Sequence, residues 1–296
     1  MDDAKAIAGK VSEKIQDKFT GATKHTWVIV LVVAAMFILI LVIIYVTTML
    51  KASKLQNVIL QTTMIGIDNR EVVPFTVPAA NMSLVLNGQE YSYSFWIFLG
   101  GLYSTTSQQK IIIQRGNSHS YATNSLQISP STSPLIMMDP VSNIMYFCAA
   151  TSAVTTSMVA SDVIAKDTTG TYTSGYLVTT IDYVPLQRWV NIAMVVKDMS
   201  MYIYMDADLY SVITVSDIST STSVNPMIKG TNGDLLIGDK VNYTPGYISM
   251  TRFYNYALTQ NDIQSLYNAG PVPTSWLSYL GLKNYGVRTP VYALPT

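Results

Sequence analysis

Few side chains in this sequence could perform acid–base or nucleophilic chemistry. The only glutamates are Glu13, Glu71 and Glu90, and the only histidines are His25 and His119. Glycoside hydrolysis generally needs two carboxylates held about 5–10 Å apart across the scissile bond. The three glutamates are far apart in the sequence, and the neighbouring aspartates Asp206 and Asp208 are expected in a hairpin turn. We therefore expect that the protein is not an enzyme.

The single cysteine, Cys148, excludes an intrachain disulfide. We expect it to be a small buried hydrophobe in a strand at residues 144–149, since a nucleophilic thiol would need a basic partner. One cysteine and two histidines cannot form a zinc site. Gly100-Gly101 is not followed by the Gly-Lys-Ser/Thr of a phosphate-binding loop. We therefore expect no zinc and no nucleotide cofactor.

Charged side chains are scarce in this chain. They make up 12% of the residues, and the 18 Lys and Arg residues balance the 18 Asp and Glu residues, whereas charged residues are about a quarter of an average domain. Without a basic patch to hold a polyanion, we expect no nucleic-acid partner. A polar, weakly charged surface suits a protein that packs among other proteins or faces glycans.

An unbroken run of 20 apolar residues, WVIVLVVAAMFILILVIIYV, begins at Trp27. A helix of this length is about 30 Å long, the thickness of the hydrocarbon core of a bilayer. Trp27 and Tyr45 lie near its two ends, where aromatic rings favour the membrane interface, and Lys24 and Lys51 bracket it. The run predicts a transmembrane helix at residues 26–50, which acts as an uncleaved anchor because no small-x-small cleavage site follows it.

Three further segments flank the anchor and the main domain. Residues 1–24 carry apolar side chains at spacings of three and four, which predicts an amphipathic helix on the membrane or against a partner; a frayed tail is the alternative. Residues 51–80 are interpreted as a stalk, because Pro74 and Pro78 favour extended chain. Residues 271–296 combine prolines and aromatics, so we expect an extended arm packed on its own domain or a neighbour.

The intervening residues, 81–270, have the pattern of many short strands. The clearest, at residues 91–99, alternates with period two and places Tyr93, Phe95 and Ile97 on one face and Trp96 on the other. Further strands are predicted at residues 110–115, 135–138, 144–149, 189–196, 201–205 and 209–215, separated by polar turns.

One helix is predicted after the anchor, at residues 261–268. Thr259 is a good N-cap, Asp262 completes a capping box, and Gly270 followed by Pro271 ends the helix. Short strands with regular turns and a single late helix predict an all-β, antiparallel β-sandwich.

Two stretches of the sequence resemble concanavalin A-like, laminin-G-type domains. The first is QRWVNIAMVVK at residues 187–197, followed by MYIYMDADLY at 201–210; the second is LLIGD at 235–239, followed by GYISMTRFYNYALTQNDIQSLYNAGP at 246–271. In this family the first pattern is a Trp-containing strand that leads into a Tyr-x-Asp-Gly hairpin, and the second closes the sheet and forms one helix. Ala207 replaces the usual glycine of that hairpin.

The resemblance implies a concanavalin A-like (laminin-G-type) β-sandwich, here preceded by a single N-terminal transmembrane α-helix. The hydrolases of this fold carry a Glu-x-Asp-x-x-Glu strand that this sequence lacks. Laminin-G-type domains often bind calcium through loop Asp and Asn side chains, so the resemblance makes four residues candidate ligands: Asp206, Asp208, Asp239 and Asn242. Residues of these types also occur in turns for backbone reasons alone.

Two Asn-x-Ser/Thr sequences, at Asn81 and Asn242, could accept a glycan if the domain enters a secretory lumen. An anchored domain of this kind also resembles a minor structural, capsid-associated membrane protein of a large algal DNA virus. That resemblance implies a lipid bilayer, other capsid or membrane proteins and further copies of the chain as partners, at the interface of a virion's inner membrane and its capsid. The alternative is a membrane-anchored adhesin or lectin that binds glycans.

Overall fold

The computed structural model describes residues 29, 31–46, 59–61, 64–67, 74–82, 90–101, 108–117, 119–122, 125–168, 170–217 and 226–272. The chain divides into two compact units, Met1–Gln56 and Asn57–Thr296. The amphipathic segment predicted at 1–24 lies outside the described residues, as do Lys24, Trp27, Lys51 and the arm beyond Val272.

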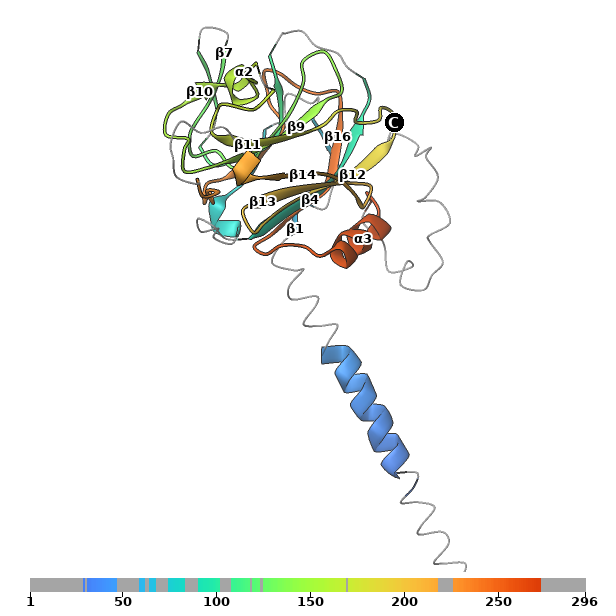
Figure 1. Cartoon of the computed structure of the whole chain (residues 1–296). Coiled ribbons are helices and arrows are strands. Elements are labelled where there is room, and N and C mark those ends of the chain that lie inside the picture. Colours follow the sequence, from blue (N-terminus) through green and yellow to red (C-terminus); the bar gives the residue numbers. More distant parts are fainter. Residues whose placement is uncertain are drawn as a thin grey trace, which may run out of the picture. The chain divides into compact units, whose positions relative to one another are not determined.

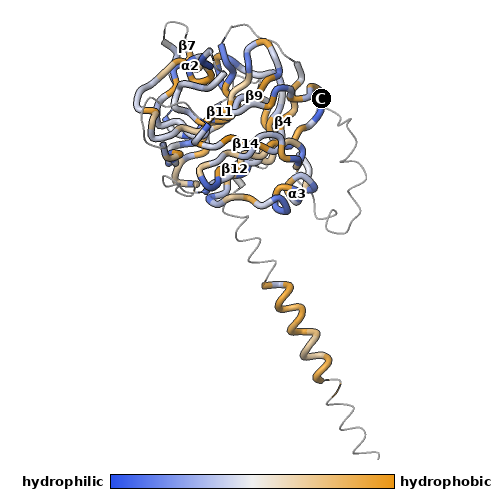
Figure 2. The backbone as a smooth tube through the Cα atoms, viewed as in Figure 1, coloured by the Kyte–Doolittle hydropathy of each residue, from blue (hydrophilic) through white to orange (hydrophobic). Residues whose placement is uncertain are grey.

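The first unit contains an α-helix at residues 31–46. Its residues are hydrophobic along nearly the whole described length (Figure 2). Large apolar side chains are exposed at every turn of it, from 65% at Leu31 to 46% at Val46. No helix in the described part of the chain is long and apolar enough to cross a membrane.

The second unit is a β-sandwich in which two antiparallel sheets face each other (Figure 1). Among the described residues, one sheet has the order β1 (Ile59–Gln61), β16 (Gly246–Tyr254), β4 (Tyr91–Leu99), β12 (Trp189–Lys197), β13 (Ser200–Met205) and β14 (Asp208–Thr214), with β2 (Ile65–Gly66) also on β16. The other has the order β11 (Tyr176–Ile181), β9 (Met145–Ala150), β8 (Leu135–Met138), β5 (Lys110–Arg115), β15 (Leu235–Ile237) and β3 (Phe75–Val77).

Smaller elements complete the described unit. A short third sheet contains β10 (Met158–Val159), β7 (Ser125–Ile128) and β6 (Ser120–Ala122). The helical elements are α2 (Ala160–Val163), α3 (Gln260–Ala269) and the 3₁₀ turns η1 (Ala79–Asn81) and η2 (Val215–Asp217).

Strand β4 shows how the sequence pattern builds the core. Tyr93, Phe95 and Ile97 are at most 1% exposed and lie between the two sheets. The alternate residues Trp96 and Phe98 face outward, where they form a separate apolar cluster. The strand predicted at residues 91–99 and its two faces are confirmed, because alternating side chains of a strand point to opposite sides of a sheet.

Helix α3 covers part of the outer face of the seven-stranded sheet (Figure 1). The Thr259 side chain accepts a hydrogen bond from the Asp262 backbone N–H at 3.3 Å, and the Asp262 carboxylate accepts one from the Thr259 backbone N–H at 3.0 Å. Ile263 and Leu266 are buried against the sheet. The predicted helix and its capping box are therefore confirmed.

The β13–β14 hairpin turns at Asp206 and Ala207, as the sequence predicts. Both residues have positive φ, 53° and 70°, the conformation that tight hairpins require and glycine adopts most easily. Ala207 is 1% exposed, and its carbonyl accepts a hydrogen bond of 2.7 Å from Gln260 Nε2. Ala207 therefore occupies a left-handed backbone position where the laminin-G-type family usually has glycine, and its carbonyl contacts α3.

Three short stretches of the predicted stalk at residues 51–80 belong to the sandwich. Strands β1 and β2 pair with β16, and β3 pairs with β15, so this stretch supplies strands to both sheets. These strands are two or three residues long, too short for a periodic pattern to reveal. Their partner strands, β15 and β16, lie far away in the sequence. The local pattern therefore showed only the prolines, which indicate extended chain but not its pairing.

Candidate functional site

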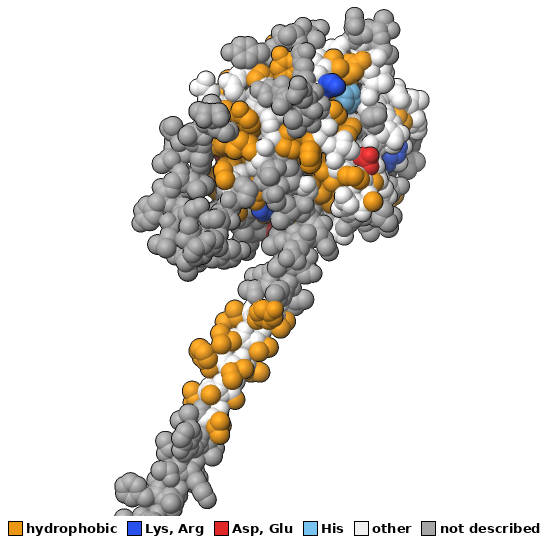
Figure 3. Space-filling view, turned by 180° about the vertical axis from the view of Figure 1, so that it is seen from behind, with side chains coloured by type: hydrophobic (Ala, Val, Ile, Leu, Met, Phe, Trp, Pro, Cys, Tyr) orange, Lys and Arg blue, Asp and Glu red, His pale blue; other side chains and the backbone are white. Residues whose placement is uncertain are grey.

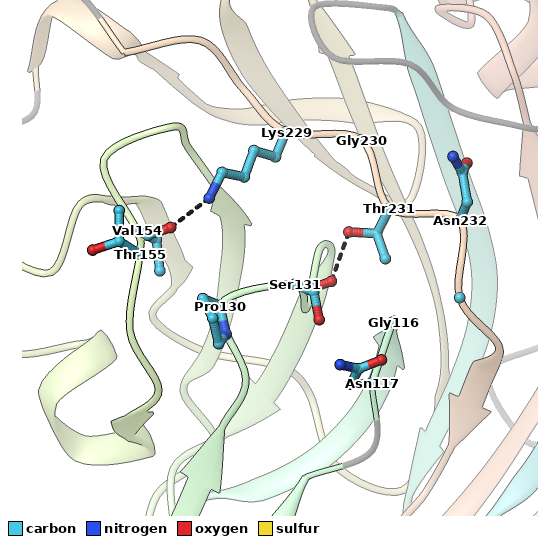
Figure 4. Close-up of a pocket in the computed structure, with 11 residues that line it drawn as sticks. Gly116, Asn117, Pro130, Ser131, Val154, Thr155, Lys229, Gly230, Thr231 and Asn232 are labelled. Carbon is cyan, nitrogen blue, oxygen red and sulfur yellow. Dashed lines mark hydrogen bonds between the residues drawn. The ribbon is translucent and has the colours of Figure 1, made fainter.

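An open cleft of about 530 Å³ lies where four chain segments meet at one end of the sandwich (Figure 4). Gly116 and Asn117 follow β5, and Pro130 and Ser131 lie between β7 and β8. Val154 and Thr155 follow β9, and the segment Lys229–Gly233 leads into β15. Its volume is in the range of small-ligand pockets, about 300–1,000 Å³.

Two glycines let the floor of the cleft close. A Cβ on Gly233 would lie 2.5 Å from Gly116 Cα, and a Cβ on Gly116 would lie 2.3 Å from the Ser131 carbonyl oxygen. Gly116 also has φ +122°, which side-chain-bearing residues rarely adopt. The Gly116 N–H donates to the Asp234 carbonyl at 3.0 Å, so the two backbones are in direct contact.

Lys229 supplies a cationic side chain of the lining. Ile228 forms a β-bridge with Thr151 and is 2% exposed, so its neighbours in this extended chain, Met227 and Lys229, point away from the core. The Lys229 ammonium donates a hydrogen bond to the Val154 carbonyl oxygen across the cleft (Figure 4). Among the described residues the ammonium has this one hydrogen-bond partner, so it is held at the wall and keeps two of its three donors for a ligand.

Hydroxyl and amide groups provide the rest of the polar lining. Thr231 Oγ1 donates to the Ser131 carbonyl at 2.8 Å. Behind the lining, the buried Thr132 Oγ1 donates to the Asn117 carbonyl at 3.3 Å. None of the lining residues that the structure describes is acidic or aromatic. These residues can bind polar groups, but they do not include the pair of carboxylates that acid–base hydrolysis needs.

A buried cation lies behind the cleft floor. Arg115 is 1% exposed; its Nε donates to the Gly233 carbonyl at 3.3 Å, and its guanidinium carbon lies 4.7 Å from the centre of the Phe253 ring. Its Nη1 donates to Tyr93 Oη at 3.4 Å. The guanidinium adds positive charge beneath a site already lined by Lys229.

A second polar cluster forms around Asp239, which is 2% exposed. The Tyr121 hydroxyl donates to this carboxylate, and His119 Nε2 lies 3.4 Å from it. The other ring nitrogen, His119 Nδ1, lies 2.9 Å from Gln114 Oε1. Gln114 Nε2 in turn donates to the Asn117 carbonyl at 3.3 Å, so this cluster supports one wall of the cleft.

The hydrogen bonds determine the charge state of Asp239. Burial alone would raise the pKa of this carboxyl group, but hydrogen bonds from His119, Tyr121 and the Val241 backbone outweigh it and lower the pKa. Burial, together with the hydrogen bond to Asp239, raises the pKa of the Tyr121 hydroxyl. The pair is therefore an ionised carboxylate that accepts from a neutral phenol.

The four candidate calcium ligands lie on two different sheets. Asp206 accepts from Arg188 Nη2 at 2.8 Å and from the Asn191 N–H at 2.9 Å at the β13–β14 turn, where Asp208 is exposed. Asp239 and Asn242 follow β15 in the other sheet. Among the described residues, no three His, Cys, Asp or Glu side chains form a group that could hold a metal ion. Calcium binding stays a prediction.

The two candidate glycosylation sites differ in accessibility. Asn81 is exposed at the end of η1. Asn242 is 3% exposed, and its Nδ2 donates to Gln108 Oε1 at 3.0 Å and to Tyr121 Oη at 3.4 Å. A glycan on Asn242 would replace these bonds, so only Asn81 offers an accessible amide in the folded domain.

The remaining residues singled out in the sequence behave as core or surface groups. Cys148 in β9 is fully buried in an apolar cluster, and this burial raises the pKa of its thiol. Tyr45 is 61% exposed on the helix of the first unit. The sequence did not single out Lys229 or the glycines at 116 and 233, because only folding brings their segments together.

Residues 155–264 match the sequence model of the Concanavalin A-like lectin/glucanases superfamily. The match extends from β10 into α3 and includes the Trp-containing strand and the hairpin. The sandwich is concanavalin A-like. The fold class predicted from the laminin-G-type motifs is thus confirmed for this domain.

Several solved structures share similarity with the concanavalin A-like domain. They include the receptor binding domain of botulinum neurotoxin C/D mosaic serotype (14% identity, TM-score 0.40, covering 61% of this chain and 36% of that one). The botulinum neurotoxin serotype G binding domain is 13% identical, with TM-score 0.39 and coverage of 65% and 39%. The binding domain of botulinum neurotoxin DC in complex with rat synaptotagmin II is 16% identical, with TM-score 0.37 and coverage of 62% and 36%.

This chain spans under two fifths of the length of those three structures. No curated protein sequence matches the chain.

Proposed function

We propose that this protein is a membrane-anchored, non-catalytic structural protein whose concanavalin A-like domain docks to other proteins. The observation that carries the proposal is the apolar helix. The sequence has 20 consecutive apolar residues from Trp27, and the described helix within this run, at 31–46, exposes large apolar side chains on all its sides. Such a surface is unfavourable in water and favourable in hydrocarbon.

The chemistry of the domain supports a binding role over a catalytic one. The residues described in the lining of its cleft include no carboxylate, and Asp206 and Asp239 are engaged in hydrogen bonds within the domain. On the face shown in Figure 3, few charged side chains are visible among the described residues. A weakly charged, polar surface is suited to packing among neighbouring proteins.

The finer assignment is a minor capsid protein that links a virion's internal membrane to its capsid shell. It is supported by the resemblance of an anchored laminin-G-type domain to capsid-associated membrane proteins of large algal DNA viruses. The two parts of such a protein have separate roles. A transmembrane helix makes attachment to the membrane effectively irreversible, and the sandwich supplies a surface for contact with other proteins.

A membrane-anchored glycan-binding adhesin is the second candidate. The open cleft favours it, because hydroxyl and amide groups of Ser131, Thr155 and Asn232 could bind sugar hydroxyls. In the structural protein the domain surface contacts other proteins, whereas in the adhesin the cleft contacts a glycan.

Vesicle flotation tests the anchor directly. The full chain should float with phosphatidylcholine vesicles after extraction with carbonate, whereas a variant lacking residues 1–56 should stay at the bottom of the gradient. Equal behaviour of the two proteins would refute the membrane assignment.

Neighbour identification and ligand screening test the role of the domain. Cross-linking of the full chain in its native particle should yield adducts with other structural proteins. The domain should show no binding on a glycan array and no calcium-dependent rise in melting temperature. Binding to glycans, together with an absence of cross-linked protein neighbours, would refute the structural role and support the adhesin.

A further inference from the structure

We propose that the cleft binds an acidic segment of a partner protein, with Lys229 contacting a carboxylate and Met227 contacting an adjacent apolar side chain. This inference rests on the proposed docking function and specifies where the partner is held. Lys229 lines the cleft (Figure 4), and Met227 comes two residues before it in the sequence, next to the segment that leads into β15.

The charge of the cleft selects an anion. Lys229 is half-buried, and in the described part of the chain it forms no ion pair with Asp or Glu. Arg115 adds a buried positive charge behind the Gly233 carbonyl. The nearest acidic residue in sequence, Asp234, is exposed, and its Oδ1 accepts from the Ala79 N–H at 2.8 Å. A carboxylate entering the cleft therefore meets an ammonium with available donors, and such charge-assisted hydrogen bonds are the stronger kind.

An exposed apolar side chain two residues from Lys229 favours a peptide as the occupant. Met227 is 49% exposed and lies on the same side of its extended segment as Lys229, because Ile228 between them points into the core. Methionine adapts to varied apolar partners. The described residues of the lining include no aromatic ring on which a sugar could stack. The pairing of a cation with a flexible apolar side chain fits an acidic residue next to Leu, Ile, Met or Phe.

The binding surface is fixed before a ligand arrives. The Lys229 N–H donates to the Ala150 carbonyl at 2.8 Å, and Ser152 N–H donates to the Met227 carbonyl at 2.8 Å. Ser152 Oγ also accepts from the Met227 N–H at 3.1 Å. A preorganised segment loses little conformational entropy on binding, which favours affinity.

A randomised hexapeptide library tests the proposal on the full chain in detergent. Bound peptides should be enriched in Asp or Glu next to an apolar residue. Lys229→Gln should remove the acidic enrichment and weaken binding of a selected peptide about tenfold or more, the scale expected for a lost hydrogen bond to a charged group. Lys229→Arg should retain binding, and Lys240→Gln, a change at an exposed lysine outside the lining, should leave it unaltered.

Two results would overturn the peptide site, and a third would overturn only the structural role. Absence of acidic enrichment, or enrichment that persists in Lys229→Gln at an unchanged melting temperature, excludes Lys229 as the anchor of a carboxylate. Binding of glucuronate or sialyllactose that Lys229→Gln abolishes would make the occupant a sugar. If peptides bind as expected but the particle yields no protein neighbours, the proposed structural role fails while the peptide site stands.

Discussion

At the scale of single residues, buried polar groups determine how the domain responds to pH. Asp239 accepts hydrogen bonds from Tyr121, from the Val241 N–H at 3.0 Å and from the Asn242 N–H at 3.3 Å. Since its pKa is lowered in the folded protein, its ionised form stabilises the fold above its unfolded pKa of about 3.9. That contribution is lost as the pH falls through the lower, folded pKa.

We expect Asp239→Asn to lower the free energy of unfolding at pH 7 by about 1–3 kcal/mol, because buried donors lose a charged acceptor. The difference from the unsubstituted protein should shrink as the pH falls below about 4. Urea denaturation between pH 3 and pH 7 measures both effects. Asp208→Asn, at an exposed position, is the control and should have little effect; an equal loss at all pH values would contradict the pKa argument.

Cys148 provides a second residue-scale prediction. Its side chain is fully buried, and burial raises the pKa of the thiol, so little reactive thiolate is present in the folded protein. Because it is the only cysteine, its reaction with a disulfide reagent at pH 8 should be slow in buffer and rapid in 8 M urea. Rapid labelling in buffer without loss of the folded circular dichroism signal would show that β9 is accessible.

At the scale of elements, backbone contact between β5 and the segment before β15 shapes the cleft. Gly233→Ala would place a Cβ 2.5 Å from Gly116 Cα. Gly116 Cα is a backbone atom, so it cannot move aside by a change of side-chain rotamer. We expect a loss of about 2 kcal/mol or more in the free energy of unfolding, in the range of overpacking effects. Gly100→Ala is matched to it, since the nearest contact is 3.7 Å and ordinary; thermal unfolding of both variants distinguishes them.

The capping box of α3 makes a prediction at the same scale. Thr259→Ala removes the hydroxyl that accepts from the Asp262 N–H, and should lower the free energy of unfolding by about 1 kcal/mol. Ser265→Ala, in the exposed middle of the helix, should be nearly neutral. Chemical denaturation measures the difference, and equal effects would show that the cap does not stabilise the helix in the folded domain.

At the scale of the whole molecule, the two units should respond independently to substitution. Leu39 is 60% exposed on the helix of the first unit. Leu39→Arg should oppose membrane insertion, because an arginine at the centre of a spanning helix costs about 2.5–3.5 kcal/mol. The sandwich should keep its melting temperature, because its core is formed by its own strands.

Carbonate extraction of membranes containing each variant measures this prediction. The unsubstituted chain should stay in the membrane pellet and Leu39→Arg should appear partly in the supernatant. Val141→Arg, at a position 73% exposed on the sandwich, adds the same charge and should remain in the pellet. Identical partitioning of all three proteins would remove the membrane assignment.

Local patterns in the sequence predicted much of the architecture. Period-two alternation placed β4 and both of its faces, and Thr259 with Asp262 located α3. Asp206 and Ala207 marked the β13–β14 turn. These features depend on neighbours within a few residues, so a linear pattern contains the necessary information.

Only the tertiary structure identified β1 to β3 as parts of the sheets and assembled the cleft. Arg115 and Gly233, which meet at its floor, are 118 positions apart. Asp239 and Asn242 were singled out as possible calcium ligands, yet their partners Tyr121 and Gln108 come from distant strands and loops. The sequence alone thus determined the apolar run, the sandwich and the scarcity of catalytic groups. Long-range packing decided which polar residues share a site, because such contacts leave no periodic signal in the chain.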